Sequence, residues 1–373
     1  MEKKYKILQI GGGNFVGGGR SKIIYELCEC LDKEKYEVYY HLVNPLAEEL
    51  KPVIKNVIYT PSKYKNKVLR IMNDSYCYVK TLRQFKFDII HFNTDSVREQ
   101  WRYIVLSILF SDSKIVIHGH STNSSKSEKV VKLYRNLFMK FFRKRVALFL
   151  ACSEEAAEFL VGKTYVDDVV VLKNGIVISK YKYDPAIRNI MRKSLNIDDS
   201  TLVLGSVGRL SLYKNFDYLI RIYSELQKKI PDSKLLIIGE GEMRDSLQKT
   251  IDELGLTERV CLLGMKNNVN EYLQAFDVFC LTTLFEGFGI VNIEAQAAGL
   301  PCVISNGCPK AVDLTGEVLF LSVDMLPGDW SEAIFDFLQN HDRYDKCQMI
   351  KDKGYDLLDS ALRLQQLYDA ILD

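Results

Sequence analysis

The most informative stretch of the sequence is Phe285-Glu-Gly-Phe-Gly-Ile-Val-Asn-Ile-Glu-Ala-Gln-Ala-Ala-Gly299. It follows an apolar run at Val278–Leu281, and its glycine-containing start leads into a pattern that predicts a helix over Ile290–Ala298. Gly299 and Pro301 end that helix, and a second apolar run follows at once. A strand, a glycine loop, a helix and a second strand are typical of a parallel sheet that is covered by helices.

The same alternation continues along the whole chain, which predicts an α/β protein with two parallel sheets. The predicted strands of the first half are Lys6–Ile10, Glu37–Val43, Val57–Tyr59, Asp88–Phe92, Lys114–His118, Leu148–Ala151 and Val169–Leu172. Those of the second half are Leu202–Val207, Lys234–Ile238, Arg259–Leu263, Val278–Leu281, Pro301–Ile304 and Val318–Leu321.

A change of pattern separates the two halves. An Asn174-Gly175 turn and the polar stretch Ser179–Pro185 predict a hinge, so we expect domains at 1–177 and 178–354. The last segment, Tyr355–Asp373, has apolar residues at helical spacing and no strand after it. We therefore expect a final helix that docks elsewhere on the protein.

The composition is that of a folded protein with almost no net charge. With 373 residues, 47% of them hydrophobic, the chain is long enough for about two domains. The formal charge of +2 gives no reason to expect a nucleic acid as partner. Nine cysteines without a C-x-x-C pair favour reduced thiols and a cytoplasmic protein. No secretory leader is evident after Met1, and the longest lipid-like stretch, near Ile104–Phe110, is too short to span a membrane, so we expect a soluble or peripheral protein.

A glycine-rich loop follows the first predicted strand. Six of the nine residues in Gly11–Gly19 are glycine, and a predicted helix begins just after them, which suits the binding of a phosphate group. The dinucleotide template fails at Val16 or Lys22, and the P-loop template fails at Asn14 and Arg20. These failures disfavour a hydride-transferring dehydrogenase. A flexible turn without a ligand is the alternative interpretation.

Two cations follow the first strand of the second predicted sheet. Gly208 and Arg209 come directly after that strand, and Lys214 lies in the next short loop. Ligands of open parallel sheets sit at this carboxyl edge. An Arg fork and a Lys point charge together can neutralise a diphosphate. The alternative is that both are ordinary surface charges.

Two glutamates lie within the stretch quoted first. Glu286 and Glu294 would be ~12 Å apart along a continuous helix, but Glu286 precedes the predicted helix. The loop can therefore turn them toward different parts of one extended ligand. Glu294 could accept hydrogen bonds from a ribose diol, while Glu286 and the backbone N–H groups of Gly287–Ile290 could meet sugar hydroxyls and phosphate. Alternatively, both carboxylates face solvent.

Taken together, these features resemble the retaining glycosyltransferases of family 4. The resemblance rests on four features: the pair Glu286 and Glu294 eight residues apart, Gly208-Arg209 with Lys214, the Asn174-Gly175 turn, and the N-terminal glycine loop. The resemblance implies the GT-B fold, in which two Rossmann-like doubly wound domains face a central cleft. It also implies a nucleotide-sugar donor on the C-terminal domain, no metal or other cofactor, and a last helix, 355–373, that returns to the first domain.

The resemblance also implies roles for individual residues. Arg209 and Lys214 would hold the donor diphosphate, and Glu294 the ribose. Glu286 would contact the transferred sugar together with Gly287, Phe288, Gly289 and Ile290. The remaining donor contacts would be Gly18 and Gly19 near the phosphate, Gly208, and the base-binding Met265, Lys266 and Asn267. A histidine beside the transferred sugar would be His120, or else His118. Retention would proceed by front-face attack, with the leaving phosphate helping to deprotonate the acceptor.

The segment 126–145 combines charge with apolar residues. It contains eight Lys or Arg and a single Glu, interleaved with apolar side chains at helical spacing. Such a helix suits an anionic membrane surface, where a lipid-linked acceptor would be found. The alternative is a helix with a core-facing apolar stripe and a solvated basic back.

The expected activity is therefore the transfer of a hexose or N-acetylhexosamine from a UDP-sugar to a glycan or lipid-linked acceptor in surface polysaccharide synthesis. The alternatives are a non-catalytic GT-B protein that binds a nucleotide or stabilises a partner transferase, and a UDP-sugar epimerase. A scaffold has no chemical need for Arg209, Lys214, Glu286 and Glu294 together.

Overall fold

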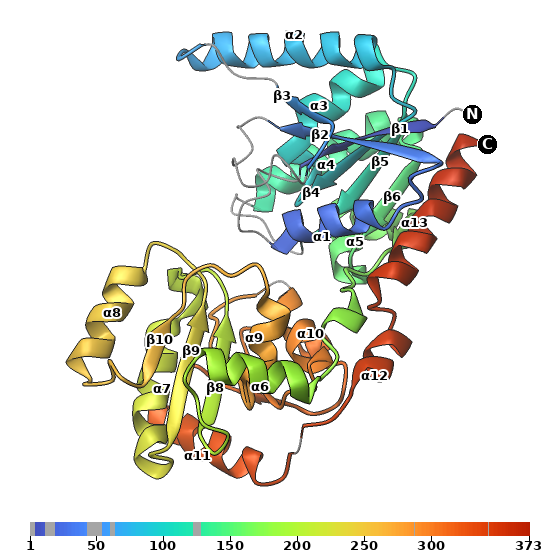
Figure 1. Ribbon diagram of the computed structural model, residues 1–373. Helices are drawn as coiled ribbons and strands as arrows, with labels where there is room; N and C mark the ends of the chain where they lie inside the picture. Colours follow the sequence, from blue (N-terminus) through green and yellow to red (C-terminus); the bar gives the residue numbers. More distant parts are fainter. Residues whose placement is uncertain are drawn as a thin grey trace. The chain divides into compact units, whose positions relative to one another are not determined.

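The computed structural model describes residues 4–11, 19–42, 54–59, 64–121, 128–286, 288–341 and 343–373 (Figure 1). These residues form two compact units. Unit 1 comprises Met1–Gly175 and Leu357–Asp373, and unit 2 comprises Ile176–Asp356.

Unit 1 is built on a seven-stranded parallel sheet in the order β3-β2-β1-β4-β5-β6-β7. Its strands are β1 (Tyr5–Ile10), β2 (Tyr36–Leu42), β3 (Val57–Tyr59), β4 (Ile89–Thr94), β5 (Lys114–Gly119), β6 (Leu148–Ala151) and β7 (Val169–Val171). Its helices are α1 (Gly19–Glu29), α2 (Lys67–Phe85), α3 (Val97–Phe110), α4 (Glu128–Phe142), α5 (Glu154–Val161) and α13 (Leu357–Leu372). All seven predicted strands are confirmed, with ends that differ by at most two residues.

Unit 2 is built on a six-stranded parallel sheet in the order β10-β9-β8-β11-β12-β13. Its strands are β8 (Leu202–Val207), β9 (Ser233–Ile238), β10 (Val260–Leu262), β11 (Val278–Leu281), β12 (Cys302–Ser305) and β13 (Val318–Leu321). Its helices are α6 (Pro185–Ser194), α7 (Phe216–Lys229), α8 (Arg244–Glu253), α9 (Val269–Ala275), α10 (Ile290–Ala297), α11 (Pro327–Leu338) and α12 (Cys347–Asp352). The six predicted strands are confirmed to within one residue at each end.

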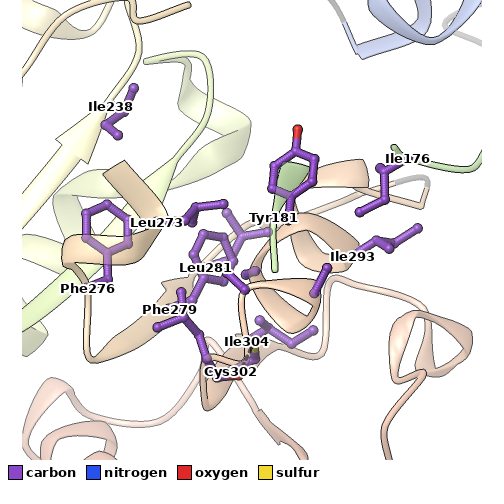
Figure 2. Packing of buried hydrophobic residues seen from close by; sticks show 14 of the residues in the cluster. Ile176, Tyr181, Ile238, Leu273, Phe276, Phe279, Leu281, Ile293, Cys302 and Ile304 are labelled. Atoms are coloured by element: carbon purple, nitrogen blue, oxygen red, sulfur yellow. Dashed lines mark hydrogen bonds between the residues drawn. The ribbon is translucent and has the colours of Figure 1, made fainter. Parts of the chain in front are cut away.

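The central strands are apolar on both faces because helices cover both sides of each sheet. Every residue of β4, β11 and β12 is buried. Figure 2 shows one core of unit 2, in which side chains from α9, β11, α10 and β12 gather around Leu281. This core packs against α10 and so fixes the position of the helix that carries Glu294.

A partly buried ion cluster joins α6 to the start of β11. Asp277 accepts hydrogen bonds from Arg188 (2.6 Å), from Arg192 (3.2 Å) and from the backbone N–H of Val203 (2.7 Å). The Arg192 guanidinium, 1% exposed, also donates to the carbonyl oxygens of Ala275 and Asp198. The charges are thus paired and hydrogen-bonded, which is the condition for burying them.

The last helix, α13, packs on α1 within unit 1. The Asp32 backbone N–H donates to the Gln365 side chain (2.7 Å), and Lys35 pairs with Asp369 (2.7 Å). The hydroxyl of Tyr36 also donates to Asp369. The Tyr368 side chain is fully buried, so α13 is an integral part of the unit 1 core.

Candidate functional site

Each sheet has a switch point, where the chain reverses the direction in which it adds strands. In unit 2 this point lies between β8 and β11, and in unit 1 between β1 and β4. Loops diverge there at the carboxyl ends of the strands and leave room for a ligand. Most predicted site residues of unit 2 follow β8 or β11, Met265–Asn267 follow β10, and His120 of unit 1 follows β5, the neighbour of β4.

Backbone hydrogen bonds hold the ends of β8, β9 and β10 together. The N–H of Gly208 donates to the carbonyl of Ile238, and that of Gly239 to Gly264, both at 2.9 Å. Gly239 has φ +144°, and a Cβ built on it would lie 1.9 Å from the Gly208 carbonyl oxygen. Any other residue at 239 would push the loop after β9 away from the loop after β8. Sequence reasoning missed Gly239, although a glycine directly after a buried strand is a signal for close backbone approach.

Lys214 and Glu286 come together from two different loops. Lys214 ends the short 3-10 helix η5 (Leu212–Lys214), and its ammonium group forms an ion pair with the Glu286 carboxylate. Each of the two side chains is 19% exposed. The loop is held against the end of β11, because the Leu284 N–H (2.8 Å) and the Thr283 hydroxyl (2.9 Å) both donate to the carbonyl of Tyr213.

Arg209 has a different partner. Its guanidinium donates to Glu242 at 3.0 Å, and the Arg209 side chain is 69% exposed. An exposed pair of this kind contributes only about 0–1 kcal/mol. Arg209 can therefore exchange Glu242 for an anionic ligand at little cost, whereas Lys214 is already held in place by Glu286.

The N-terminus of α10 lies beside Glu286. Gly289 is the N-cap residue, with φ +68°, and among the described residues no side chain caps the helix there. A Cβ on Gly289 would lie 2.8 Å from Cγ of Glu286 and from Nδ2 of Asn292. The first N–H groups of α10, which begins at Ile290, thus carry the partial positive charge of a helix start.

Three further residues that were predicted to contact the donor each lie against a tyrosine side chain. Glu294 is buried, and its Oε1 accepts a hydrogen bond from the Tyr181 hydroxyl at 2.7 Å. The ring of Phe288 stacks on Tyr355, with centroids 5.2 Å apart. Lys266 lies with its ammonium 5.7 Å from the Tyr272 ring centre. Neither Tyr181 nor Tyr355 was foreseen from the sequence.

The other predicted contacts lie in the loop after β10, at the start of α1 or outside the described residues. Met265 and Asn267 are exposed in the loop after β10. Gly19 is the first residue of α1. Gly18 and Gly287 lie outside the described residues.

Of the two predicted histidines, His118 is buried and His120 is half-buried, and their ring centroids are 4.0 Å apart. Burial lowers the pKa of His118 to about 3, so its ring is neutral. Within the described residues neither ring nitrogen of His118 has a hydrogen-bond partner. His120 Nε2 lies 3.0 Å from Oδ1 of Asn93 at the end of β4.

A buried polar chain fixes the tautomer of His120. Asn93 donates from Nδ2 to Oε1 of Gln9 (2.8 Å), which orients its amide and turns Oδ1 toward His120. A carbonyl oxygen only accepts, so Nε2 donates to Asn93, and in the neutral form of the ring Nδ1 carries the lone pair. Gln9 in turn donates from Nε2 to the Tyr368 hydroxyl (3.4 Å), which lies 2.5 Å from Nδ1 of His91. Sequence reasoning missed Asn93, Gln9 and Tyr368.

The apolar residues of the segment 126–145 are divided between core and surface. On α4, Val131, Phe138 and Met139 are buried. Val130, Leu133, Leu137 and Phe141 are exposed. Part of the segment therefore serves the core, and a second apolar stripe faces outward.

Two family models match the chain in succession. "Glycosyltransferase Family 4" matches residues 17–180, and "Glycosyl transferases group 1" matches residues 187–356, so together they cover most of the chain. The chain belongs to the family 4 glycosyltransferases. It is thus a nucleotide-sugar-dependent enzyme of a family of retaining hexosyltransferases.

Relatives of this glycosyltransferase include bacterial enzymes of glycan synthesis. It is 28% identical over 301 residues to the Escherichia coli UDP-Gal:alpha-D-GlcNAc-diphosphoundecaprenol alpha-1,3-galactosyltransferase, covering 77% of this chain and 76% of the relative. It is 25% identical over 300 residues to the amylovoran biosynthesis glycosyltransferase AmsD of Erwinia amylovora, with 80% of each chain covered.

Solved structures show the GT-B fold. The Anabaena protein HepE, solved in complex with UDP and glucose, superposes with a TM-score of 0.77 at 19% identity, covering 98% of this chain and 100% of HepE. WaaG, a glycosyltransferase of lipopolysaccharide biosynthesis, gives 0.67 at 16% identity, covering 98% of both chains. The predicted GT-B fold is confirmed.

Two kinds of feature are absent from the described residues. No group of three or more His, Cys, Asp or Glu side chains among them is placed to hold a metal ion. In the same part of the chain, no helix combines the length and the apolar character that crossing a bilayer requires.

Proposed function

We propose that this glycosyltransferase moves a hexose or N-acetylhexosamine from a UDP-sugar to a glycan or lipid-linked acceptor in the synthesis of a bacterial surface polysaccharide. The name of the Escherichia coli relative supports both halves of the proposal, because it includes a UDP-Gal donor and a diphosphoundecaprenol-linked acceptor. The UDP in the HepE crystals supports the choice of nucleotide.

The observation that carries the proposal is the cationic edge of the unit 2 sheet. Lys214, the exchangeable Arg209 and the uncapped start of α10 all follow β8 or β11 at the switch point. Cleavage of a sugar–phosphate bond builds negative charge on the departing diphosphate, and fixed positive groups there stabilise the transition state. We assign the diphosphate to Arg209 and Lys214.

The remaining donor assignments follow the same edge. The ribose diol goes to Glu294, whose Oε1 already accepts from Tyr181. The sugar goes to Glu286, Phe288 and Gly289, and the base to the loop Met265–Asn267. The positive φ of Gly289 and the lack of room for a Cβ there support a site in which a ligand approaches the main chain.

The reaction breaks the bond between the anomeric carbon and the β-phosphate oxygen and forms one between that carbon and the acceptor oxygen. The acceptor hydroxyl proton passes to the leaving diphosphate. We place His120 beside the transferred sugar, in the tautomer that Asn93 imposes. No oxidant, reductant or further co-reactant is needed for this balance.

The proposed acceptor is lipid-linked, so the enzyme would work as a peripheral protein at the cytoplasmic face of a membrane. The outward stripe of α4, Val130, Leu133, Leu137 and Phe141, supports this proposal. Exposed lysines at 129, 132 and 140 accompany the stripe and would face anionic lipid headgroups.

The test incubates the full chain with UDP-sugars, with and without a polyprenyl-diphosphate-linked glycan. Formation of a new α-linked product from a UDP-hexose or UDP-N-acetylhexosamine is expected, and it should be lost in the Lys214→Gln variant. An epimerised donor in the absence of acceptor would instead identify an epimerase. UDP-sugar binding without any product, with every acceptor tried, would identify a non-catalytic protein.

A further inference from the structure

Helix α2 exposes a stripe of large apolar side chains. Val68, Met72 and Tyr76 follow one another at intervals of one helical turn, with Leu69 and Ile71 on either side. Met72 is 64% exposed and Tyr76 is 70% exposed. Soluble monomeric proteins seldom expose apolar side chains in such a contiguous group, so the stripe indicates a surface that binds something.

The fold does not require Val68, Met72 or Tyr76 to be apolar, because α2 packs through a different side of the helix, on which Ile71 also lies. Tyr78 and Leu82 are buried, and the Tyr78 hydroxyl lies 2.7 Å from the Ser107 hydroxyl of α3. Arg102 of α3 donates to the carbonyl of Ile71 at 2.8 Å. Asn66 caps the helix by accepting from the N–H groups of Val68 and Leu69, so the helix is well formed from its first turn. In Figure 1 the first turns of α2 extend past the strands of unit 1.

The charges on α2 are of one sign. Its exposed charged residues are all basic, namely Lys67, Arg70, Lys80 and Arg83. The acidic residue of the helix, Asp74, is buried. At 100° per residue, Lys67 lies beside one edge of the apolar stripe and Lys80 beside the other. An apolar stripe bordered by basic residues is the pattern of a helix that lies in a membrane interface.

The surface continues onto the end of α3. Leu109 and Phe110 are exposed there, and the Arg83 guanidinium lies 5.7 Å from the Phe110 ring centre. On its other side α3 meets α4, where the rings of Trp101 and Tyr134 are 5.3 Å apart. Helices α2, α3 and α4 are therefore consecutive neighbours in one layer.

We propose that α2 docks unit 1 onto an anionic lipid bilayer, with the stripe at the acyl boundary and the flanking basic side chains at the lipid phosphates. Charge decides between a bilayer and a second copy of the chain. A symmetric dimer through α2 would bring two identical basic faces together, and like charges repel. An anionic bilayer complements the same face. The inference extends the proposed function, since a lipid-linked acceptor lies in a bilayer, but it rests on the α2 surface.

The experiment is flotation of the full chain with vesicles of phosphatidylcholine and of an equimolar phosphatidylcholine–phosphatidylglycerol mixture, without any sugar donor. We compare the wild type with the exposed-residue triple variant Val68→Gln, Met72→Gln, Tyr76→Gln. The matched variant on α4 is Leu133→Gln, Leu137→Gln, Phe141→Gln. Thermal unfolding checks that each variant is folded.

The wild type should float with the anionic vesicles far more than with the neutral ones. The α2 variant should lose about tenfold or more of this binding, whatever the α4 variant does. Unchanged flotation of the folded α2 variant would overturn the proposal. A second outcome would also overturn it: the wild type binds neither kind of vesicle and is a dimer, and the α2 variant is a monomer. The α2 variant should still transfer sugar to a lipid-free acceptor analogue. If the wild type does not transfer sugar to this analogue, that result counts against the proposed function and not against membrane docking by α2.

Discussion

At the scale of single residues, Arg209 and Lys214 are both cations of the same sheet edge but differ in what holds them. Lys214 is mostly buried and paired with Glu286, while Arg209 is exposed and paired with Glu242. The first is positioned before any ligand arrives. The second must leave its partner to meet an anion. Both differences can be tested by single substitutions.

Replacing Arg209 by Ala should lower kcat/KM for transfer by about 10²–10³-fold, or about 2.7–4 kcal/mol, if the guanidinium stabilises the departing diphosphate. Stability should hardly change, because the Arg209–Glu242 pair is exposed. Steady-state kinetics and thermal unfolding measure the two quantities. Arg221→Ala removes an equally simple exposed ion pair on α7 and is the control. Equal kcat/KM in the two variants would remove Arg209 from the site.

Asn93 should control the protonation of His120. In Asn93→Asp, a carboxylate would replace the neutral Oδ1 that lies 3.0 Å from His120 Nε2. An adjacent negative charge favours the imidazolium and raises the pKa of the ring. The limb of the kcat/KM–pH profile that reports His120 should therefore move to higher pH, whichever form of the ring is active. Asn136→Asp, at an exposed site on α4, controls for added charge. A folded Asn93→Asp enzyme with an unshifted profile would contradict the assignment.

At the scale of elements, the three loops after β8, β9 and β10 are joined because Gly239 lets their backbones meet. Gly239→Ala would place a Cβ 1.9 Å from the Gly208 carbonyl oxygen. The loops must then separate, and KM for the nucleotide sugar should rise about tenfold or more. Gly255→Ala is the matched control, since its φ is also positive (+67°) but nothing lies within 4 Å of the added Cβ. It should lower stability by about 1 kcal/mol and leave KM unchanged. The same KM in both variants would show that the loop contact has no part in binding.

The strands could be predicted from the sequence because a buried parallel strand is an uninterrupted apolar run, a purely local pattern. The contacts between distant residues could not. Tyr181 meets Glu294, and Gln9 meets Tyr368, only because packing brings together residues far apart in the chain. Periodicity was also insufficient for α4, because a helical stripe of apolar residues looks the same whether it faces a core or the outside. The structure divides the apolar residues of α4 between the two.

At the scale of the whole molecule, the two units differ in how they respond to acid. Unit 1 contains three buried histidines, and burial lowers the pKa of His41 to about 4, that of His118 to about 3 and that of His91 well below its usual range. In unit 2 the described histidine, His341, is half-buried. In the unfolded chain the pKa of each of these rings is about 6.5.

Acid should therefore destabilise unit 1 first. Between about pH 6.5 and pH 4 the unfolded form of unit 1 binds up to three protons that the folded form does not. Its free energy of unfolding should fall by about 1.4 kcal/mol per pH unit for each histidine. Hydrogen exchange followed from neutral to mildly acidic pH measures the two units separately. His41→Phe keeps an aromatic ring beside Tyr78 and Tyr103 and should remove about one third of the slope, while His341→Phe should leave it unchanged. Equal protection of unit 1 across this range would contradict the expectation.

We expect a nucleoside diphosphate to bind at the carboxyl edge of the unit 2 sheet. Hydrogen exchange of the full chain with and without saturating UDP tests it most directly. We expect slower exchange at 208–214, at 239–242 and at 288–292, the three segments that meet at that edge. Saturation with UDP that leaves all three segments unchanged, or slows exchange only in unit 1, would contradict it.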